Sequence, residues 1–276
     1  MAYGHVGNAA ALFALQRLGV EVWAVHTVQF SNHPGHGDWT GRVASGAEIA
    51  EVVAGIERRG VFGGCDAVLS GYMGDASVAE AVLDAVRRVR NANPAALYCC
   101  DPVIGDGGRV YVHEAIPRLI AERFVPEADL LTPNQFELER LTGIECRTAA
   151  SVRRAIGALR ERMRAGGPRA VLLTSAGTDE TPPGALDVVA ADRHGMSALR
   201  VPLLQVAASG AGDVTAALFL HHYLRTVRAE TAMAAAAASI HGLLRRTAAS
   251  NARELLLIDA QDELVTPSSR FATRIF

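Results

Sequence analysis

The sequence predicts an α/β protein built as a three-layer α/β/α sandwich, with helices on both faces of a mostly parallel central sheet. Strand-like aliphatic runs alternate with helical stretches of ten or more residues, which indicates parallel strands joined by helical crossovers. A chain of 276 residues is long enough for one large domain of this kind. Because no internal repeat or low-complexity linker divides it, we expect a single domain spanning residues 1–276.

The first elements follow this alternation. Residues 8–18 carry apolar side chains at helical spacing and end at Gly19, a typical residue just beyond a helix. The aliphatic run 21–28 predicts a strand, and residues 45–58 place apolar side chains on one helical face. The next elements are expected, in order, as a strand at 66–70, a helix at 76–90 and strands at 95–100 and 128–131.

The second half continues the pattern and adds a hairpin. We expect helices at 135–141 and 151–164, a strand at 169–174, a hairpin of 186–191 with 198–203, and closing helices at 211–224 and 231–246. In a parallel sheet, ligands bind at the carboxyl ends of the strands. The residues just after each strand are therefore the ones expected to carry chemistry.

The composition points to a small-molecule ligand rather than to a nucleic acid or a membrane. The formal net charge is −2 with both signs interspersed, so the chain lacks a basic patch for nucleic acid or a membrane surface. It also shows no apolar stretch of membrane-spanning length and no leader-like start. Cys65, Cys99, Cys100 and Cys146 lack metal-site spacing and fit buried thiols in a reducing compartment. We expect a cytoplasmic protein.

The most informative run is the turn before the predicted helix at 211–224. Gly210, Ala211, Gly212 and Asp213 stand immediately before an apolar helical stretch. Glycines allow a tight turn that brings backbone N–H groups toward one point, and a helix N-terminus favours an anion there. A carboxylate at that point can accept a proton. The alternative is an ordinary turn in which Asp213 only caps the helix.

Further polar side chains follow the predicted strands. Asp101, Asp106 and Glu137 are expected to lie close enough together to surround a hard cation such as Mg²⁺. The alternative for Glu137 is a capping box with Asn134, and the alternative for Asp101 is a solvated turn before proline. Tyr72 comes after the strand at 66–70, either to stack on a flat apolar ligand or to join the core.

Taken together, these segments resemble the pyridoxal kinase family of the ribokinase-like superfamily. The matching runs, in order, are YGHVGN at 3–8, TVQFSNH at 27–33, LSGY at 69–72, CDPVIGD at 100–106, LTPNQFE at 131–137 and GAGD at 210–213. The QFSNH segment is the most diagnostic, because the wider superfamily shares the Gly/Asp turn but not this run. The resemblance extends from about residue 3 to the tail.

The resemblance implies transfer of the γ-phosphoryl group of ATP to the 5′-hydroxymethyl group of pyridoxal, pyridoxine or pyridoxamine, the salvage reaction that yields pyridoxal 5′-phosphate. Asp213 would be the base, and the amides of Gly210, Ala211 and Gly212 would hold the transferring phosphate. The implied vitamer site comprises Val28, Phe30, His33, Tyr72 and Asp213. The implied ATP site comprises Asp101, Asp106, Tyr111, Thr132, Asn134, Glu137, Thr174, Ser175 and Gly212, of which Asp101, Asp106 and Glu137 would also serve Mg²⁺.

The resemblance also implies a flap and a quaternary structure. Tyr111 would belong to a flap over ATP, and the glycines between residues 105 and 108 suit a mobile lid that excludes water. ATP and Mg²⁺ are the expected cofactors, and the sequence leaves open whether a monovalent cation such as K⁺ is required. Family members are usually homodimers, so a homodimer is expected.

Three departures from the family pattern bear on activity. The family begins with a strand ending in Gln-Ser-His-Val, and we expect that first strand, with the serine that contacts the pyridine ring, to be absent here because of a start codon placed too far downstream. Pro34 replaces a threonine that contacts substrate, and proline offers neither a hydroxyl nor an N–H. Ala211 stands where some members carry threonine.

Two other functions are weighed beside pyridoxal kinase. A hydroxymethylpyrimidine kinase, or another ribokinase-like vitamin kinase, would share the Gly/Asp turn, but the 27–33 segment favours a pyridoxal-type pocket. The missing first strand instead favours a catalytically impaired protein that binds the vitamer or the nucleotide without turnover.

Overall fold

The computed structural model describes residues 1–206, 208–250, 252 and 254–276. In this part of the chain, the central feature is a seven-stranded sheet with the order β11–β10–β9–β8–β7–β4–β3. Its strands are β3 (Ala67–Ser70), β4 (Leu97–Cys100), β7 (Leu130–Leu131), β8 (Ala170–Ala176), β9 (Ala185–Asp192), β10 (Gly195–Pro202) and β11 (Arg274–Ile275). Strands β3, β4, β7 and β8 are parallel, and β9, β10 and β11 extend the sheet with antiparallel pairs.

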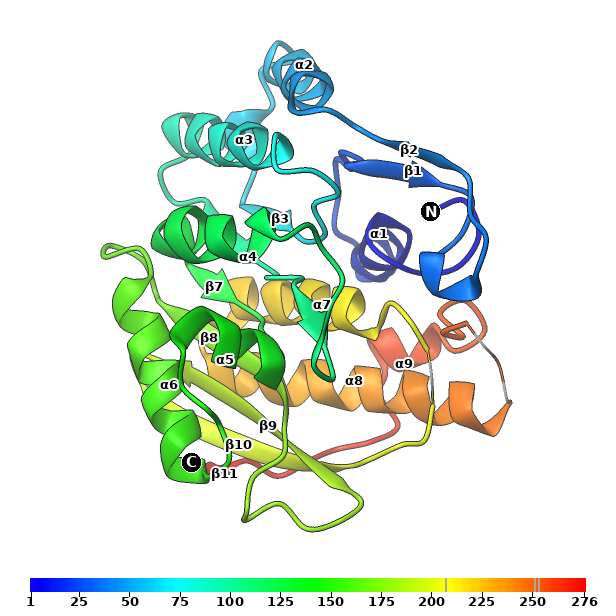
Figure 1. Cartoon of the computed structure of the whole chain (residues 1–276), viewed down its shortest axis with the longest axis vertical. Helices are drawn as coiled ribbons and strands as arrows, with labels where there is room; N and C mark the ends of the chain where they lie inside the picture. The colour runs from blue at the N-terminus through cyan, green and yellow to red at the C-terminus, as the bar shows by residue number, and fades with distance from the viewer. Residues whose placement is uncertain (207, 251, 253) are drawn as a thin grey trace.

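Helices cover both faces of this sheet, as Figure 1 shows. One face carries α1 (Asn8–Arg17), α7 (Ala211–Thr226) and α8 (Ala229–Ala249), and the short α9 (Asp262–Val265) packs on α8. The other face carries α2 (Gly46–Glu57), α3 (Val78–Ala92), α4 (Ala115–Leu119), α5 (Gln135–Thr142) and α6 (Ala149–Arg162).

The two faces have separate apolar cores that share the strands. Cys99 and Leu130 join the core with α1, α7 and α8, whereas their neighbours Tyr98 and Leu131 join the core with α3 and α6. Successive side chains of a strand point to opposite faces, so both sides of the sheet are buried. The predicted α/β/α sandwich is confirmed, and so is the burial of the free thiols of Cys99, Cys100 and Cys146, with Cys65 half-buried. A helix with the length and apolarity to cross a membrane is absent from the described residues.

Two small hairpins stand outside the main sheet. One joins β1 (Val28–Phe30) to β2 (Gly41–Val43), and its loop contains a single 3₁₀ turn at Pro34–His36. The other joins β5 (Gly105–Asp106) to β6 (Arg109–Val110) directly after β4. The tight β5–β6 turn uses Gly107 and Gly108, both with positive φ. Neither hairpin was anticipated as a strand pair.

The predicted strand at 21–28 is wrong for most of its length. Only Val28 belongs to a strand, and residues 20–27 have no ladder partner among the described residues. An aliphatic run supplies side chains that suit a strand, but a strand forms only where a neighbour pairs with its backbone groups. Here the Val25 carbonyl instead accepts a hydrogen bond from the side chain of Asn8 at 2.9 Å. The other predicted helices and strands are present, with ends that differ by a few residues.

Candidate active site

The Gly/Asp turn forms the first turn of α7. Gly210 is the N-cap residue with a φ of 92°, a left-handed conformation that glycine adopts without strain. A Cβ at this position would lie 1.7 Å from the carbonyl oxygen of His5. The turn is therefore packed directly on the segment that precedes α1. Gly210 offers the helix no side-chain cap, so the N–H groups at the start of α7 are available to a ligand.

Asp213 lies three residues after the cap, so the alternative in which it merely caps the helix is wrong. Its carboxylate accepts a hydrogen bond from the backbone N–H of Gly7, which is the N-cap of α1. Burial raises the pKa of Asp213, and the Gly7 N–H opposes that shift. The N-termini of two helices thus converge on one half-buried carboxylate. A carboxyl group with a raised pKa in such a place is suited to take up and release a proton.

Asp101 directly follows β4 and is buried, so it does not lie in a solvated turn. Thr132 follows the neighbouring β7, and its hydroxyl donates to Asp101 Oδ1 at 2.9 Å. Burial raises the pKa of Asp101 well above its ordinary range, and the charges of Glu137 and Asp213 raise it further. These three carboxylates come from separate segments and lie close enough to interact electrostatically. The site therefore carries an excess of negative charge.

Glu137 has the capping role that the sequence left open. One carboxylate oxygen accepts from the Asn134 backbone N–H at 2.9 Å, and Asn134 Oδ1 accepts from the Glu137 N–H at 2.9 Å, which completes a capping box on α5. Its other oxygen accepts from the Ile104 N–H at 2.9 Å. Burial nevertheless raises the pKa of Glu137 to about 7. Glu137 thus fixes the start of α5 to the segment after β4 while keeping a proton that titrates near neutrality.

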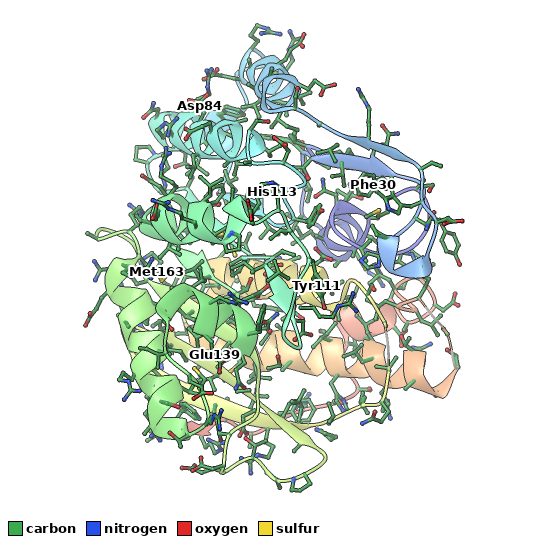
Figure 2. The ribbon with its side chains drawn as sticks, in the orientation of Figure 1. Phe30, Asp84, Tyr111, His113, Glu139 and Met163 are labelled. Atoms are coloured by element: carbon green, nitrogen blue, oxygen red, sulfur yellow. The ribbon has the colours of Figure 1, made fainter. Side chains whose placement is uncertain are left out.

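The β5–β6 hairpin carries Asp106 and leads to Tyr111. Asp106 is exposed, and its carboxylate accepts from the Gly107 N–H at 2.7 Å. Tyr111, labelled in Figure 2, is 56% exposed. The side chain of Asn134 donates to the Gly105 carbonyl at 2.8 Å and so ties the hairpin base to α5. An exposed hairpin tied to α5 at its base has the construction of a lid.

Thr174 and Ser175 lie near the carboxyl end of β8. The Thr174 N–H donates to the Pro133 carbonyl at 3.0 Å, which places it beside the turn that follows β7. The β8–β9 register shifts between Leu173 and Ala176, so both residues leave the regular ladder. The structure thus brings Thr132, Asn134 and Thr174 to one edge of the sheet.

The expected vitamer residues lie on two segments. Tyr72 is half-buried, burial raises its pKa, and its carbonyl accepts from the Thr27 hydroxyl at 2.9 Å. A Cβ on the adjacent Gly71 would lie 4.0 Å from Asp213 Oδ1, so this segment passes beside the candidate base. Val28 lies near Gly74 on the same stretch, where a Cβ would come within 2.9 Å of its methyl group.

Phe30 and His33 belong to the β1–β2 hairpin. Phe30 is buried and its ring lies 4.1 Å, centroid to centroid, from that of Trp39; Figure 2 labels Phe30 on this hairpin. His33 caps the 3₁₀ turn by accepting from the Gly35 N–H at 3.1 Å, and Pro34 is accommodated as the first residue of the turn. Burial lowers the pKa of His33. The diagnostic QFSNH run therefore leads into a loop held by a side-chain cap, and the lowered pKa of its histidine favours the neutral imidazole.

Sequence reasoning missed Glu254, which follows α8 near the end of the chain. Its Oε2 accepts from the His5 backbone N–H at 3.1 Å, and its Oε1 lies 2.7 Å from His36 Nε2. A backbone bridge joins Glu254 to Ser209, the residue before Gly210. No local motif announces this residue, because its partners are about 45 to 250 residues away in sequence.

The residues predicted to hold a metal do not form a ready-made cluster. Within the described ranges, no group of three or more His, Cys, Asp or Glu side chains is arranged to hold a metal ion. The charge of Glu137 raises the pKa of Asp101, and the charge of Asp106 raises that of Glu137, although one oxygen of Asp106, on the exposed hairpin, accepts from the Gly107 N–H. The binding of Mg²⁺ stays a prediction.

Comparison with known proteins shows the family to which the chain belongs. The phosphomethylpyrimidine kinase family model matches residues 52–255. The pyridoxal kinase PdxY of Granulibacter bethesdensis is 55% identical over 274 residues, which cover 99% of this chain and 96% of that protein. The corresponding protein of Rubrobacter xylanophilus is 51% identical over 276 residues, with 99% and 94% covered. The chain belongs to the pyridoxal kinase family.

Solved structures of pyridoxal kinases have the same fold as this chain. A pyridoxal kinase from Leishmania donovani in complex with ADP matches with a TM-score of 0.89 and 28% identity, and the match covers 99% of this chain and 96% of that one. The same enzyme in complex with ADP and pyridoxine matches with a TM-score of 0.88, and the match covers 98% and 94%. The family resemblance drawn from the sequence is thereby confirmed, and with it the ribokinase-like α/β class.

Proposed function

We propose that Asp213 is the base with which this kinase phosphorylates the 5′-hydroxymethyl group of pyridoxal and related B6 vitamers at the expense of ATP. The observation that carries the proposal is the position of Asp213. Its half-buried carboxylate lies where the N-termini of α1 and α7 meet, beside the Gly71–Tyr72 segment. A hydroxyl group between Tyr72 and Asp213 would have a proton acceptor on one side and the phosphate turn on the other.

The carboxylate of Asp213 and the backbone N–H groups of the phosphate turn have separate roles in this step. Asp213 accepts the hydroxyl proton, and the N–H groups of Gly210, Ala211 and Gly212 at the start of α7 hold the oxygens of the transferring phosphoryl group. This step needs positioning and charge neutralisation more than covalent chemistry, which suits a turn packed rigidly on His5.

The nucleotide side is supplied by the edge of the sheet. Thr132 and Asn134, in the turn after β7, and Thr174 and Ser175, near the carboxyl end of β8, would contact the triphosphate. Tyr111 would close over the nucleotide from the β5–β6 lid and exclude water from the transfer.

The acidic side of the site fits a divalent cation. Asp101 and Glu137 are buried, each has a raised pKa, and the charge of Glu137 contributes to the shift of Asp101. Two buried carboxylates held near each other are stabilised by a hard cation, and Mg²⁺ commonly uses one or two carboxylates together with substrate phosphates. Asp101 and Glu137 would hold it, with Asp106 contributing from the hairpin. When bound, Mg²⁺ would neutralise the charge of the phosphates.

The vitamer side would be formed by Val28, Phe30, His33 and Tyr72. Tyr72 follows Gly71, which passes beside Asp213, and Val28 lies near Gly74 on the same stretch. His33 would offer its other ring nitrogen, because Nδ1 accepts from the Gly35 N–H. Pro34 offers no N–H to a ligand, and it begins the 3₁₀ turn of the loop.

A panel of acceptors tests this function. The protein is incubated with ATP and Mg²⁺ and with pyridoxal, pyridoxine, pyridoxamine or hydroxymethylpyrimidine, and the phosphorylated product is measured. We expect turnover with the B6 vitamers. Preference for the pyrimidine, which the matched family model's description favours, would overturn the assignment, and binding of a vitamer without turnover would establish the non-catalytic alternative.

The remaining expectations belong to the same proposal. The chain is proposed to act as one domain and as a cytoplasmic homodimer that binds neither nucleic acid nor membrane. Sedimentation equilibrium tests the dimer, and assays with and without K⁺ test the need for a monovalent cation.

A further inference from the structure

Glu254 joins three segments that are far apart in the sequence. Its backbone pairs with Ser209, directly before the phosphate turn, and its carboxylate contacts both the His5 N–H and His36. His36 belongs to the loop of residues 31–37 that contains the QFSNH histidine. One residue therefore connects the phosphate turn through its backbone, and the segment before α1 and the loop expected to cover the vitamer through its side chain.

The chain makes room for this carboxylate. Gly4 has a φ of 90°, and a Cβ there would lie 2.6 Å from Glu254 Oε2. Any other residue at position 4 would displace the carboxylate from the His5 N–H. The second oxygen, Oε1, is buried and makes no hydrogen bond in the described part of the chain, so its 2.7 Å approach to His36 Nε2 is its one polar contact there.

Hydrogen bonds near residues 31 and 32 hold the base of the loop, whereas its tip contacts Glu254. The Ser31 carbonyl accepts from the Tyr3 N–H, the Ser31 N–H donates to the Thr40 carbonyl, and the Asn32 side chain donates to the Asp38 carbonyl at 3.0 Å. These contacts fix the base of the loop. His36, near the tip, is held by Glu254 and by the short 3₁₀ turn.

We propose that Glu254 is a positioning residue that locks the vitamer loop, residues 31–37, against the phosphate turn through His36. This inference rests on the proposed function, because it assigns Glu254 to the vitamer side of the same site. With the carboxylate in place, the loop is ordered before the vitamer binds, so binding does not have to order it. Without the carboxylate, the loop opens and the vitamer binds more weakly, while the nucleotide side is unchanged.

Steady-state kinetics of Glu254→Gln test the proposal. We expect KM for pyridoxal to rise about tenfold, because binding must then order the loop, with kcat and KM for ATP within about twofold of the parent. The matched control is Asp262→Asn, which removes an exposed carboxylate paired with Arg246 at 2.6 Å and should change none of the three constants. An unchanged KM for pyridoxal in Glu254→Gln, or equal changes in both variants, would overturn the proposal.

Hydrogen exchange supplies a readout that does not need turnover. Amides of residues 31–37 should exchange faster in Glu254→Gln, and at the parental rate in Asp262→Asn. If the parent phosphorylates no vitamer, the proposed function fails but this measurement still decides the lock. Equal exchange in the parent and in Glu254→Gln would refute it.

Histidine titration distinguishes the lock from a general loss of structure. The charge of Glu254 raises the pKa of His33, and His36 lowers it, with burial as the largest effect. Glu254→Gln should therefore lower the pKa of His33 measured by NMR, and His36→Gln should raise it. Shifts of the same sign in both variants would contradict the arrangement. Gly4→Ala, which displaces the carboxylate without removing it, should reproduce the KM effect if Glu254→Gln fails to fold.

Discussion

Replacing Gly210 with alanine should disable the phosphate turn. A Cβ at this position would lie 1.7 Å from the His5 carbonyl oxygen, and ordinary contact begins near 3.4 Å, so the two backbones must separate by about 1.7 Å, the difference between these distances. A positive φ of 92° adds about 1–2 kcal/mol of strain for a residue with a Cβ. Since a misplacement of about 1 Å can lower a rate about 100-fold, kcat/KM should fall at least that far, which corresponds to about 2.7 kcal/mol.

The assay for Gly210→Ala is kcat/KM for pyridoxal together with the thermal midpoint. The matched control is Gly157→Ala in the middle of α6, where no atom lies within 4 Å of the added Cβ and no positive φ opposes it. That control should keep full activity and gain about 0.5–1 kcal/mol of stability from helix propensity. If Gly210→Ala keeps more than about a tenth of the parental kcat/KM, the turn is not packed on His5 in the way the structure shows.

Three further outcomes follow from the same structure. Burial raises the pKa of Glu137 from 4.5 to about 7, so the unfolded chain loses this proton at a lower pH than the folded chain does. The thermal midpoint of the ligand-free protein should therefore fall as pH rises from about 5 to 7. Glu137→Gln should flatten that slope, and an unchanged slope in differential scanning calorimetry would contradict the assignment. Tyr111→Ala should raise KM for ATP several-fold with an unchanged midpoint, because its side chain is largely exposed; a fall in midpoint would place Tyr111 in the core instead. Asp129 is fully buried and paired with Arg90 and Arg164 at the amino end of β7, so Asp129→Asn should cost about 3–5 kcal/mol in urea unfolding while the folded fraction keeps its kcat, and a specific loss of kcat would show that this end of the sheet also serves catalysis.

Local patterns predicted most of the fold, because they report on forces that act within a few residues. The helix starting at Gly46 shows why: Ser45 and Glu48 close a capping box, and Ile49 and Val53 face the core. The alternating cores on the two faces of β4 and β7 follow from the same aliphatic runs that predicted the strands.

The failures concern contacts between distant segments. Residues 21–28 have the side chains of a strand, but pairing depends on a neighbour that local sequence does not specify. The β11 strand escaped notice because two residues, Arg274 and Ile275, become a strand only by pairing with β10.

In the candidate site, too, the residues with a local sequence signal could be predicted, and those defined by distant contacts could not. The GAGD turn could be assigned from the sequence, since glycine and a following carboxylate have local meaning at a helix start. Asp106 was grouped with Asp101 and Glu137 on the sequence, and its charge does act on Glu137, while the Gly107 N–H that donates to its carboxylate could not be foreseen from that grouping. Glu254 was missed because a lone acid in an apolar run has meaning only through His5 and His36.

The central claim is that Asp213 takes the proton from the vitamer hydroxyl. Asp213→Asn keeps the size of the side chain and its contact with the Gly7 N–H, but removes the basic oxygen. With pyridoxal, ATP and Mg²⁺, we predict a fall in kcat of about 100-fold or more, while calorimetric affinities for pyridoxal and for ADP stay within about threefold of the parent. A variant that keeps most of its kcat would contradict the claim.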